Sequence, residues 1–121
     1  MTNSRDKGKR GERQAAQFLR DHGYTDAHRG CQYSGEKGNP DVVGLNGVHI
    51  EVKYREQGHG QLYDWLAQSK HDSQGKLMPI VMHRKNNCEW LVTMRAEDFM
   101  EMYKEGNYEA ADNRPVSGTS D

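Results

Sequence analysis

The segment from Asp41 to Tyr54 carries the strongest structural signal in this chain of 121 residues. Leu45-Asn46-Gly47 has the composition of a tight hairpin turn, because Asn and Gly tolerate the positive φ angles that such turns need. Residues with strand-forming side chains flank it at 41–44 and 48–54. The segment predicts two antiparallel strands, and any fold of this chain must accommodate that hairpin.

The second strand of the hairpin alternates between apolar and polar side chains. Successive residues of a strand point to opposite sides, so its two faces carry different sets, Val48, Ile50 and Val52 on one and His49, Glu51 and Lys53 on the other. A carboxylate and an amine therefore project side by side. A sheet that turns its polar face to water would show the same pattern.

The length of the hairpin loop decides whether Asp41 meets Glu51. A loop of two residues pairs Asp41 with Val52 and places the two carboxylates on opposite faces. A loop of three residues, with Gly47 in the left-handed region, pairs Asp41 directly with Glu51. The residues permit either loop. Clustered carboxylates suit hard cations such as Mg²⁺, and a metal site here would need the longer loop or an Asp41 that leaves the strand before pairing.

The rest of the chain alternates between helical and strand patterns. Apolar residues at helical spacing predict three helices, over Gly8–His22, from Leu62 to near Gly75, and from about Arg95. Further strands are predicted from near Tyr24, over Leu77–His83 and over Glu89–Met94. This order predicts an α/β or α+β fold with a central mixed sheet flanked by helices, and of the two we expect α/β. We expect one domain over residues 1–105, with a polar, flexible tail at 106–121.

Charge is distributed unevenly along the chain. The net charge is -1, but residues 1–37 hold eight Lys and Arg against five Asp and Glu. A basic N-terminal region predicts an anion-binding surface, although a solvated terminus would have the same composition. The sequence shows neither a long apolar run nor an apolar leader, so we expect a cytoplasmic protein with no membrane partner.

Glu12 is unusual because it shares a helical stripe with apolar residues, namely Ala15, Ala16 and Leu19. A carboxylate that faces inward needs a cation, a hydrogen-bond partner or a water-filled cleft. The alternative is a Glu in the first helical turn, favoured by the helix dipole and reaching solvent.

The histidines are scattered, without the paired i, i+4 spacing of a zinc motif. His49 shares the face of Glu51 and Lys53, but we expect it at an edge or on the surface. Trp65 and Trp90 are expected in the core rather than as platforms for stacked bases.

Asp41 ends the run Gly38-Asn39-Pro40-Asp41, and Glu51-Val52-Lys53 follows after nine intervening residues. This arrangement resembles the signature of the PD-(D/E)xK nuclease superfamily. The helix that carries Glu12 and the segment from Arg29 to Ser34 are similar to those of archaeal and phage Holliday junction resolvases. The resemblance covers about residues 7–55 and implies a restriction-endonuclease-like fold.

The resemblance also implies roles for individual side chains. Glu12, Asp41 and Glu51 would bind the metal ion, together with the carbonyl of Val52. Lys53 would contact the attacking water or the scissile phosphate. Auxiliary roles fall to Arg13, Ser34 and Gln68. Apart from the resemblance, the basic side chains around the start of the first helix are expected to hold DNA phosphates, namely Arg5, Lys7, Lys9, Arg10 and Arg13. Arg29 and Lys37 are further residues expected to bind DNA.

These features predict a metal-dependent, structure-selective DNA endonuclease that acts at Holliday (four-way) junctions, with Mg²⁺ as its ion or Mn²⁺ in its place. A homodimer is expected, because symmetric resolution of a junction needs two cuts and one small domain carries one site. The alternatives are a nicking, repair or restriction-like nuclease of the same fold and a DNA-binding module that does not cleave.

Overall fold

Five strands form one mixed sheet in the computed structural model, which describes residues 4–30 and 39–106. In chain order the described elements are α1 (Ser4–Asp21), β1 (His28–Arg29), β2 (Val42–Val43), β3 (Val48–Tyr54), η1 (His59–Gln61), α2 (Leu62–Ser73), β4 (Met78–Arg84), β5 (Leu91–Met94) and α3 (Ala96–Glu105). The strand order is β1-β2-β3-β4-β5. The tail expected beyond residue 106 lies outside the described residues.

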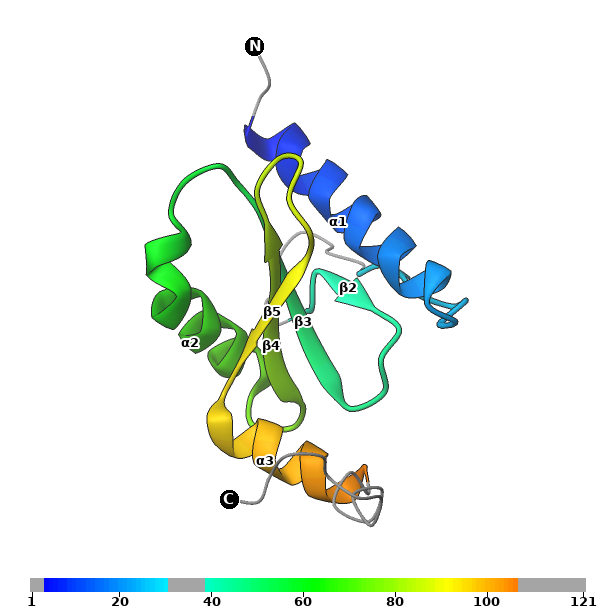
Figure 1. The fold of residues 1–121 in the computed structure, drawn as a ribbon, viewed down its shortest axis with the longest axis vertical. Helices are drawn as coiled ribbons and strands as arrows, with labels where there is room; N and C mark the ends of the chain where they lie inside the picture. Colours follow the sequence, from blue (N-terminus) through cyan, green and yellow to red (C-terminus); the bar gives the residue numbers. More distant parts are fainter. Residues whose placement is uncertain (1–3, 31–38, 107–121) are drawn as a thin grey trace, which may run out of the picture.

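The parallel pair β3–β4 forms the centre of this sheet. It runs from Val48 opposite Met78 to Tyr54 opposite Arg84, while the other neighbouring strands pair antiparallel. Parallel neighbours need a crossover connection, and α2 provides it. Figure 1 shows α1 on one side of the sheet and α2 on the other, with α3 following β5. The predicted α/β fold with a mixed sheet flanked by helices is confirmed.

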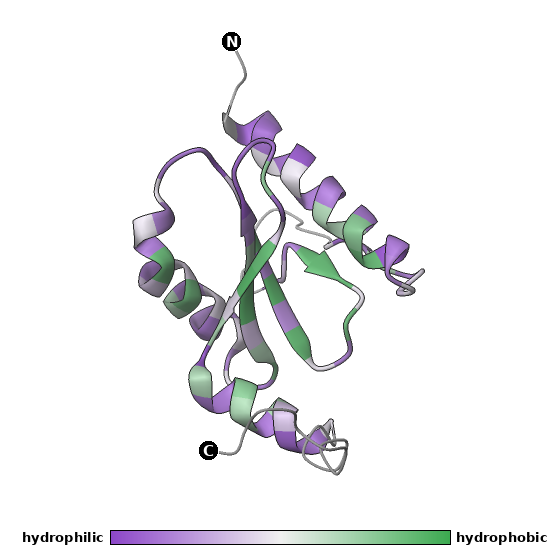
Figure 2. Cartoon of the chain, in the orientation of Figure 1, coloured by the Kyte–Doolittle hydropathy of each residue, from purple (hydrophilic) through white to green (hydrophobic). Residues whose placement is uncertain are grey.

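The face of the sheet that meets α1 holds the apolar core. Ile50 and Val52 of β3 are buried there, and so are the small residues Ala15 and Ala16 of α1, together with Leu19. Small side chains let the helix approach the strand closely. Figure 2 shows the change along α1, from a hydrophilic N-terminal half to the apolar residues that meet the sheet.

The face of the sheet that meets α2 is also buried, although it is largely polar. His49 and Glu51 are only 1% and 6% exposed, beneath Trp65, Ser69 and Ser73 of α2. The prediction that His49 lies at an edge or on the surface is therefore wrong. Alternation alone does not reveal whether the polar face of a strand is covered by a helix.

Two element starts differ most from the sequence expectation. Helix α1 begins at Ser4 instead of Gly8, which places Glu12 well beyond the first turn. Its first turn lacks apolar residues, but the ammonium of Lys7 lies 4.8 Å from the ring centroid of Tyr54 and 3.6 Å from Glu56 Oε2. The strand expected near Tyr24 starts only at His28, because the chain first makes a turn closed by a hydrogen bond of 3.0 Å from Ala27 N–H to the Tyr24 carbonyl.

The hairpin has the register of the three-residue loop. Val42 pairs with Ile50, and Gly47 has a φ of 83°, in the left-handed region that this loop requires. Asp41 lies immediately before β2, and its N–H donates to the carbonyl of Ile50 at 2.9 Å. A metal site needs only one of the two alternatives given above, and the structure has both, since the loop has three residues and Asp41 lies before the strand.

Two glycines of α1 provide a matched test of how this helix packs on β3. A Cβ added to Gly11 would lie 2.5 Å from Tyr54 Cβ, whereas one added to Gly8 meets nothing within 4 Å. We expect Gly11→Ala to lower the free energy of unfolding by about 1–3 kcal/mol through overpacking. Gly8→Ala should raise it by about 0.5–1 kcal/mol, because Ala favours helix. Equilibrium urea denaturation measures both, and a stabilised Gly11→Ala would contradict the contact.

Candidate active site

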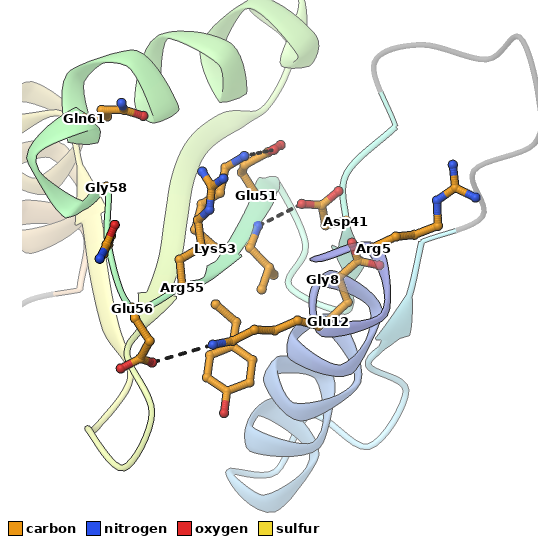
Figure 3. A pocket seen from close by; sticks show the side chains of 14 residues that line it. Arg5, Gly8, Glu12, Asp41, Glu51, Lys53, Arg55, Glu56, Gly58 and Gln61 are labelled. Atoms are coloured by element: carbon orange, nitrogen blue, oxygen red, sulfur yellow. Dashed lines mark hydrogen bonds and ion pairs between the residues drawn. The ribbon is translucent and has the colours of Figure 1, made fainter. Parts of the chain in front are cut away.

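A pocket of about 900 Å³ lies where the first half of α1, the residue before β2 and the second half of β3 meet. The three carboxylates expected to bind the metal, Glu12, Asp41 and Glu51, all line it (Figure 3). The other lining residues are Arg5, Lys7, Gly8, Val52, Lys53, Tyr54, Arg55, Glu56, Gln57, Gly58 and Gln61. The four residues expected to be catalytic therefore line one pocket.

Asp41 is held beside β3 by its backbone and by its side chain. Its carbonyl accepts from Gly30 N–H at 2.9 Å. Its carboxylate oxygen Oδ2 accepts from Val52 N–H, also at 2.9 Å. Since Val52 follows Glu51 in the strand, this bond places the Asp41 carboxylate next to the Glu51 position.

Glu12 reaches the pocket from α1, and its side chain is 16% exposed. The Nε–H of Arg29 donates to its Oε1 at 3.0 Å. Burial raises the pKa of Glu12 above its ordinary value, and the negative charge of Asp41 raises it further. The hydrogen bond and charge of Arg29 act in the opposite direction without cancelling this effect. Glu12 and Asp41 thus repel each other across the pocket.

Glu51 is a strongly perturbed carboxyl group of the pocket. Burial, followed by the charge of Asp41, raises the pKa of Glu51 to about 7. The ammonium of Lys53, 3.7 Å from Glu51 Oε2, partly offsets this rise, while the charges of Asp72 and Glu12 add to it. The charge of Lys53 therefore does not cancel the combined effect of burial and of the neighbouring carboxylates on the pKa of Glu51.

The donor set of the pocket fits a divalent cation. Carboxylate oxygens are the ligands that hard ions such as Mg²⁺ and Mn²⁺ take. An ion among Glu12, Asp41 and Glu51 would also relieve the mutual repulsion that raises the pKa of Glu12 and Glu51. The residues present are therefore suited to the metal that the sequence implied.

The remaining predicted residues are spread more widely. Lys7 and Arg5 line the pocket, whereas Lys9, Arg10 and Arg13 are exposed on α1 outside the lining. Arg29 is paired with Glu12. Ser34 and Lys37 lie outside the described residues.

Gln68 is exposed on α2 and does not line the pocket. The glutamines that do are Gln57 and Gln61, which come from the connection between β3 and α2. Sequence reasoning missed both. The available signal was their position just after the strand that carries Glu51 and Lys53.

Comparison with known proteins identifies the family. Residues 3–114 match the family described as "Phage putative PDDEXK endonuclease", and the chain belongs to this family. The predicted resemblance to PD-(D/E)xK nucleases is confirmed, so the chain is a nuclease of a class that acts on DNA and generally uses divalent metals. No curated protein sequence matches the chain. Among the described helices, none is long and apolar enough to cross a membrane.

The fold is similar to a solved resolvase structure. The match is to Hjc of Archaeoglobus fulgidus, a Holliday junction resolvase from an archaeal hyperthermophile. The TM-score is 0.51 at 22% sequence identity, over 72% of this chain and 76% of that chain. This likeness establishes the shared fold.

The raised pKa of Glu51 predicts a pH-dependent stability of the metal-free protein. A carboxyl group with a pKa of about 7 in the folded protein and 4.5 ordinarily contributes stability that is complete below about pH 4.5 and lost as the pH rises through about 7. The side chain of Glu51→Gln does not ionise. The free energy of unfolding of this variant, relative to that of the wild type, should therefore rise by on the order of 3 kcal/mol between about pH 4.5 and about pH 8.

Unfolding in EDTA across this pH range measures the effect. Glu101→Gln, at an exposed position of α3, controls for the loss of one negative charge and should show little change. A difference between Glu51→Gln and the wild type that stays constant with pH would refute the assignment.

Proposed function

We propose that this nuclease is a structure-selective endonuclease that hydrolyses phosphodiester bonds at Holliday junctions, with Mg²⁺ as its ion or Mn²⁺ in its place. The observation that carries the chemistry is the convergence of Glu12, Asp41, Glu51 and Lys53 on one pocket. The choice of a branched substrate rests on the sequence resemblance and on the fold shared with Hjc, which is a Holliday junction resolvase.

Each residue of the pocket has a task in this proposal. Glu12, Asp41 and Glu51 hold the ion, with the Val52 carbonyl as a further donor. The bound ion supplies an activated water and neutralises charge on the phosphate. Lys53, whose ammonium lies 3.7 Å from Glu51, presents a second positive charge where the transition state gathers negative charge. Arg29 keeps the Glu12 carboxylate oriented through its hydrogen bond.

The basic residues of α1 offer a path for the DNA backbone. Arg5 and Lys7 line the pocket, and Lys9, Arg10 and Arg13 continue on the exposed surface of the same helix. Contacts to phosphates come mainly from Lys and Arg and position the nucleic acid without reading its sequence. We also propose Lys37 and Ser34 as DNA or active-site contacts, on the resemblance alone. Gln68 receives no role at the pocket.

A homodimer is part of the proposal, because two symmetric cuts need two sites. Strand β5 is an edge of the sheet among the described strands, and α3 follows it. These two elements expose a group of apolar side chains, each 44–53% accessible: Leu91, Val92, Phe99, Met100 and Met102. Exposed apolar side chains on an edge strand and its neighbouring helix are suited to bury surface against a second copy.

A cleavage assay on matched substrates tests the function. We expect Mg²⁺-dependent cuts in a four-way junction, placed symmetrically in opposing strands, and much slower cleavage of flap, linear duplex and single-stranded DNA of the same sequence. Equal cleavage of flaps or duplexes would favour a repair or restriction-like nuclease. Binding without cleavage would favour the DNA-binding module.

Asp41→Asn separates chemistry from binding in the same assay. The variant keeps an oxygen that can accept from Val52 N–H but loses the negative charge. We expect cleavage to fall to background while the affinity for the junction stays within a few-fold, because phosphate contacts come from basic residues. A parallel loss of junction affinity would show that Asp41 is needed for binding as well.

Lys53 provides a second test of the mechanism. Lys53→Ala should slow single-turnover cleavage of the junction at saturating enzyme by at least about a hundredfold, the lower range for losing one transition-state contact. Lys53→Arg should restore the rate only in part, because a planar guanidinium cannot reproduce the position of a compact ammonium.

Lys104→Ala is the matched control, since Lys104 is exposed on α3 and far along the chain from the pocket. A rate for Lys53→Ala within a few-fold of the wild type would leave Lys53 as a solvated partner of Glu51, with an effect on stability of at most about 1 kcal/mol.

A further inference from the structure

A second group of possible metal ligands lies on the α2 side of the sheet. It consists of His49 and Glu51 of β3 and Asp72 of α2, and we call it the α2-side cluster. Each residue offers one ligand atom, and these atoms lie within 4.8 Å of one another. His49 and Asp72 do not line the pocket of the candidate active site, whereas Glu51 belongs to both groups.

The chain brings these three residues together through simple periodicity. His49 and Glu51 are two positions apart in β3 and therefore project from the same face. Asp72 lies three residues after Ser69 and one before Ser73, two residues of α2 that are buried against the sheet. Ser69 Oγ donates to the backbone carbonyl of His49 at 3.3 Å and to that of Ile80 at 3.1 Å. This contact fixes the helix on the strand at the level of His49.

One ring nitrogen of the His49 imidazole is buried without a hydrogen-bond partner among the described residues. Its Nε2 is buried, and within the described part of the chain no atom forms a hydrogen bond with it. The residue as a whole is 1% exposed. A buried polar atom without a partner costs on the order of 1–3 kcal/mol and calls for an explanation such as an ion or a water.

Asp72 of α2 forms no ion pair with a Lys or Arg among the described residues. Among the ion pairs found within residues 4–30 and 39–106, none involves Asp72. The ammonium of Lys53 pairs with Glu51 and lies 5.9 Å from the centroid of the Trp65 ring. Two carboxylates and one imidazole thus lie close together between β3 and α2.

We propose that the α2-side cluster binds a divalent transition-metal ion through an imidazole nitrogen of His49 and one carboxylate oxygen each of Glu51 and Asp72. An imidazole nitrogen combined with carboxylate oxygens suits Mn²⁺ or Zn²⁺ better than Mg²⁺, which prefers oxygen alone. Atoms bound to one ion at about 2.0–2.2 Å lie at most roughly 4.4 Å apart. Small side-chain rotations would bring the observed arrangement within that limit.

The proposed site shares Glu51 with the ion proposed for the pocket. One carboxylate has two oxygens, so Glu51 can serve the ion among Glu12 and Asp41 on one side and the ion at His49 and Asp72 on the other. Nitrogen ligation separates the two experimentally, because all the donors proposed for the pocket ion are oxygens. The inference concerns ion binding by the free protein and does not depend on the DNA substrate.

Pulsed EPR of Mn²⁺ bound to the full chain without DNA tests the site. The wild type should show a ¹⁴N coupling from a directly bound imidazole, and Asp41→Asn should keep it. His49→Gln, which has no imidazole, should lose the coupling. Asp72→Asn should weaken binding of the nitrogen-ligated Mn²⁺ by at least about tenfold. If His49→Gln does not fold, the Asp72→Asn titration still decides, because Asp72 is only half-buried on α2.

Matched substitutions at exposed residues serve as controls. His22→Gln removes an exposed imidazole near the end of α1, and Asp64→Asn removes an exposed carboxylate of α2; neither should change the coupling or the affinity. Absence of a ¹⁴N coupling in the wild type, its survival in His49→Gln, or unchanged affinity in Asp72→Asn would overturn the proposal. Because DNA is absent, failure here leaves the proposed nuclease function standing, and the reverse also holds.

Discussion

Burial of strand β3 on both faces is the constraint around which this structure is built. The strand pairs in parallel with β4, and α1 and α2 cover its opposite sides. Strands of this kind are usually apolar throughout, yet β3 buries His49 and Glu51 on the face toward α2. Burial of ionisable groups opposes folding unless they find partners. The strand therefore combines an apolar face that stabilises the fold with a polar face that the fold alone does not require, as is common where a protein does chemistry.

The hydrogen bond from Val52 N–H to Asp41 Oδ2 joins this strand to the candidate active site. The Val52 N–H donates to this side-chain carboxylate instead of to a backbone carbonyl of the neighbouring strand. Strand β2 contains only two residues, and the pocket lies beside β3 next to the residue that precedes β2. The spacing of Asp41 and Glu51 thus depends on the register that the three-residue hairpin loop sets and on this hydrogen bond.

Much of this arrangement could be predicted from the sequence, because it follows from local patterns. The hairpin, its polar and apolar faces and the inward stripe of Glu12 all come from periodicities of two and 3.6 residues. The start of α1 could not be found this way, because its first turn has no apolar residue and is held by contacts of Lys7 with Tyr54 and Glu56.

Tertiary placement accounts for the other differences. The burial of His49 depends on α2 crossing over the polar face of β3, which no local pattern reports. The presence of Gln61 rather than Gln68 at the pocket depends on where the connection after β3 turns toward α2. The α2-side cluster joins residues 49 and 72, and their proximity is set by the packing of helix on sheet.

The carboxylates of the pocket belong to different layers of the molecule. Asp41 and Glu51 move with the sheet, whereas Glu12 moves with α1, the helix that also carries the row of basic residues from Arg5 to Arg13. A rigid displacement of α1 would change the distance of Glu12 from the other two while their own spacing stays the same. The affinity for an ion held by all three therefore depends on the position of α1. The affinity for a polyanion that lies along that helix depends on it as well. By thermodynamic linkage, each would then alter the affinity of the protein for the other by the same factor.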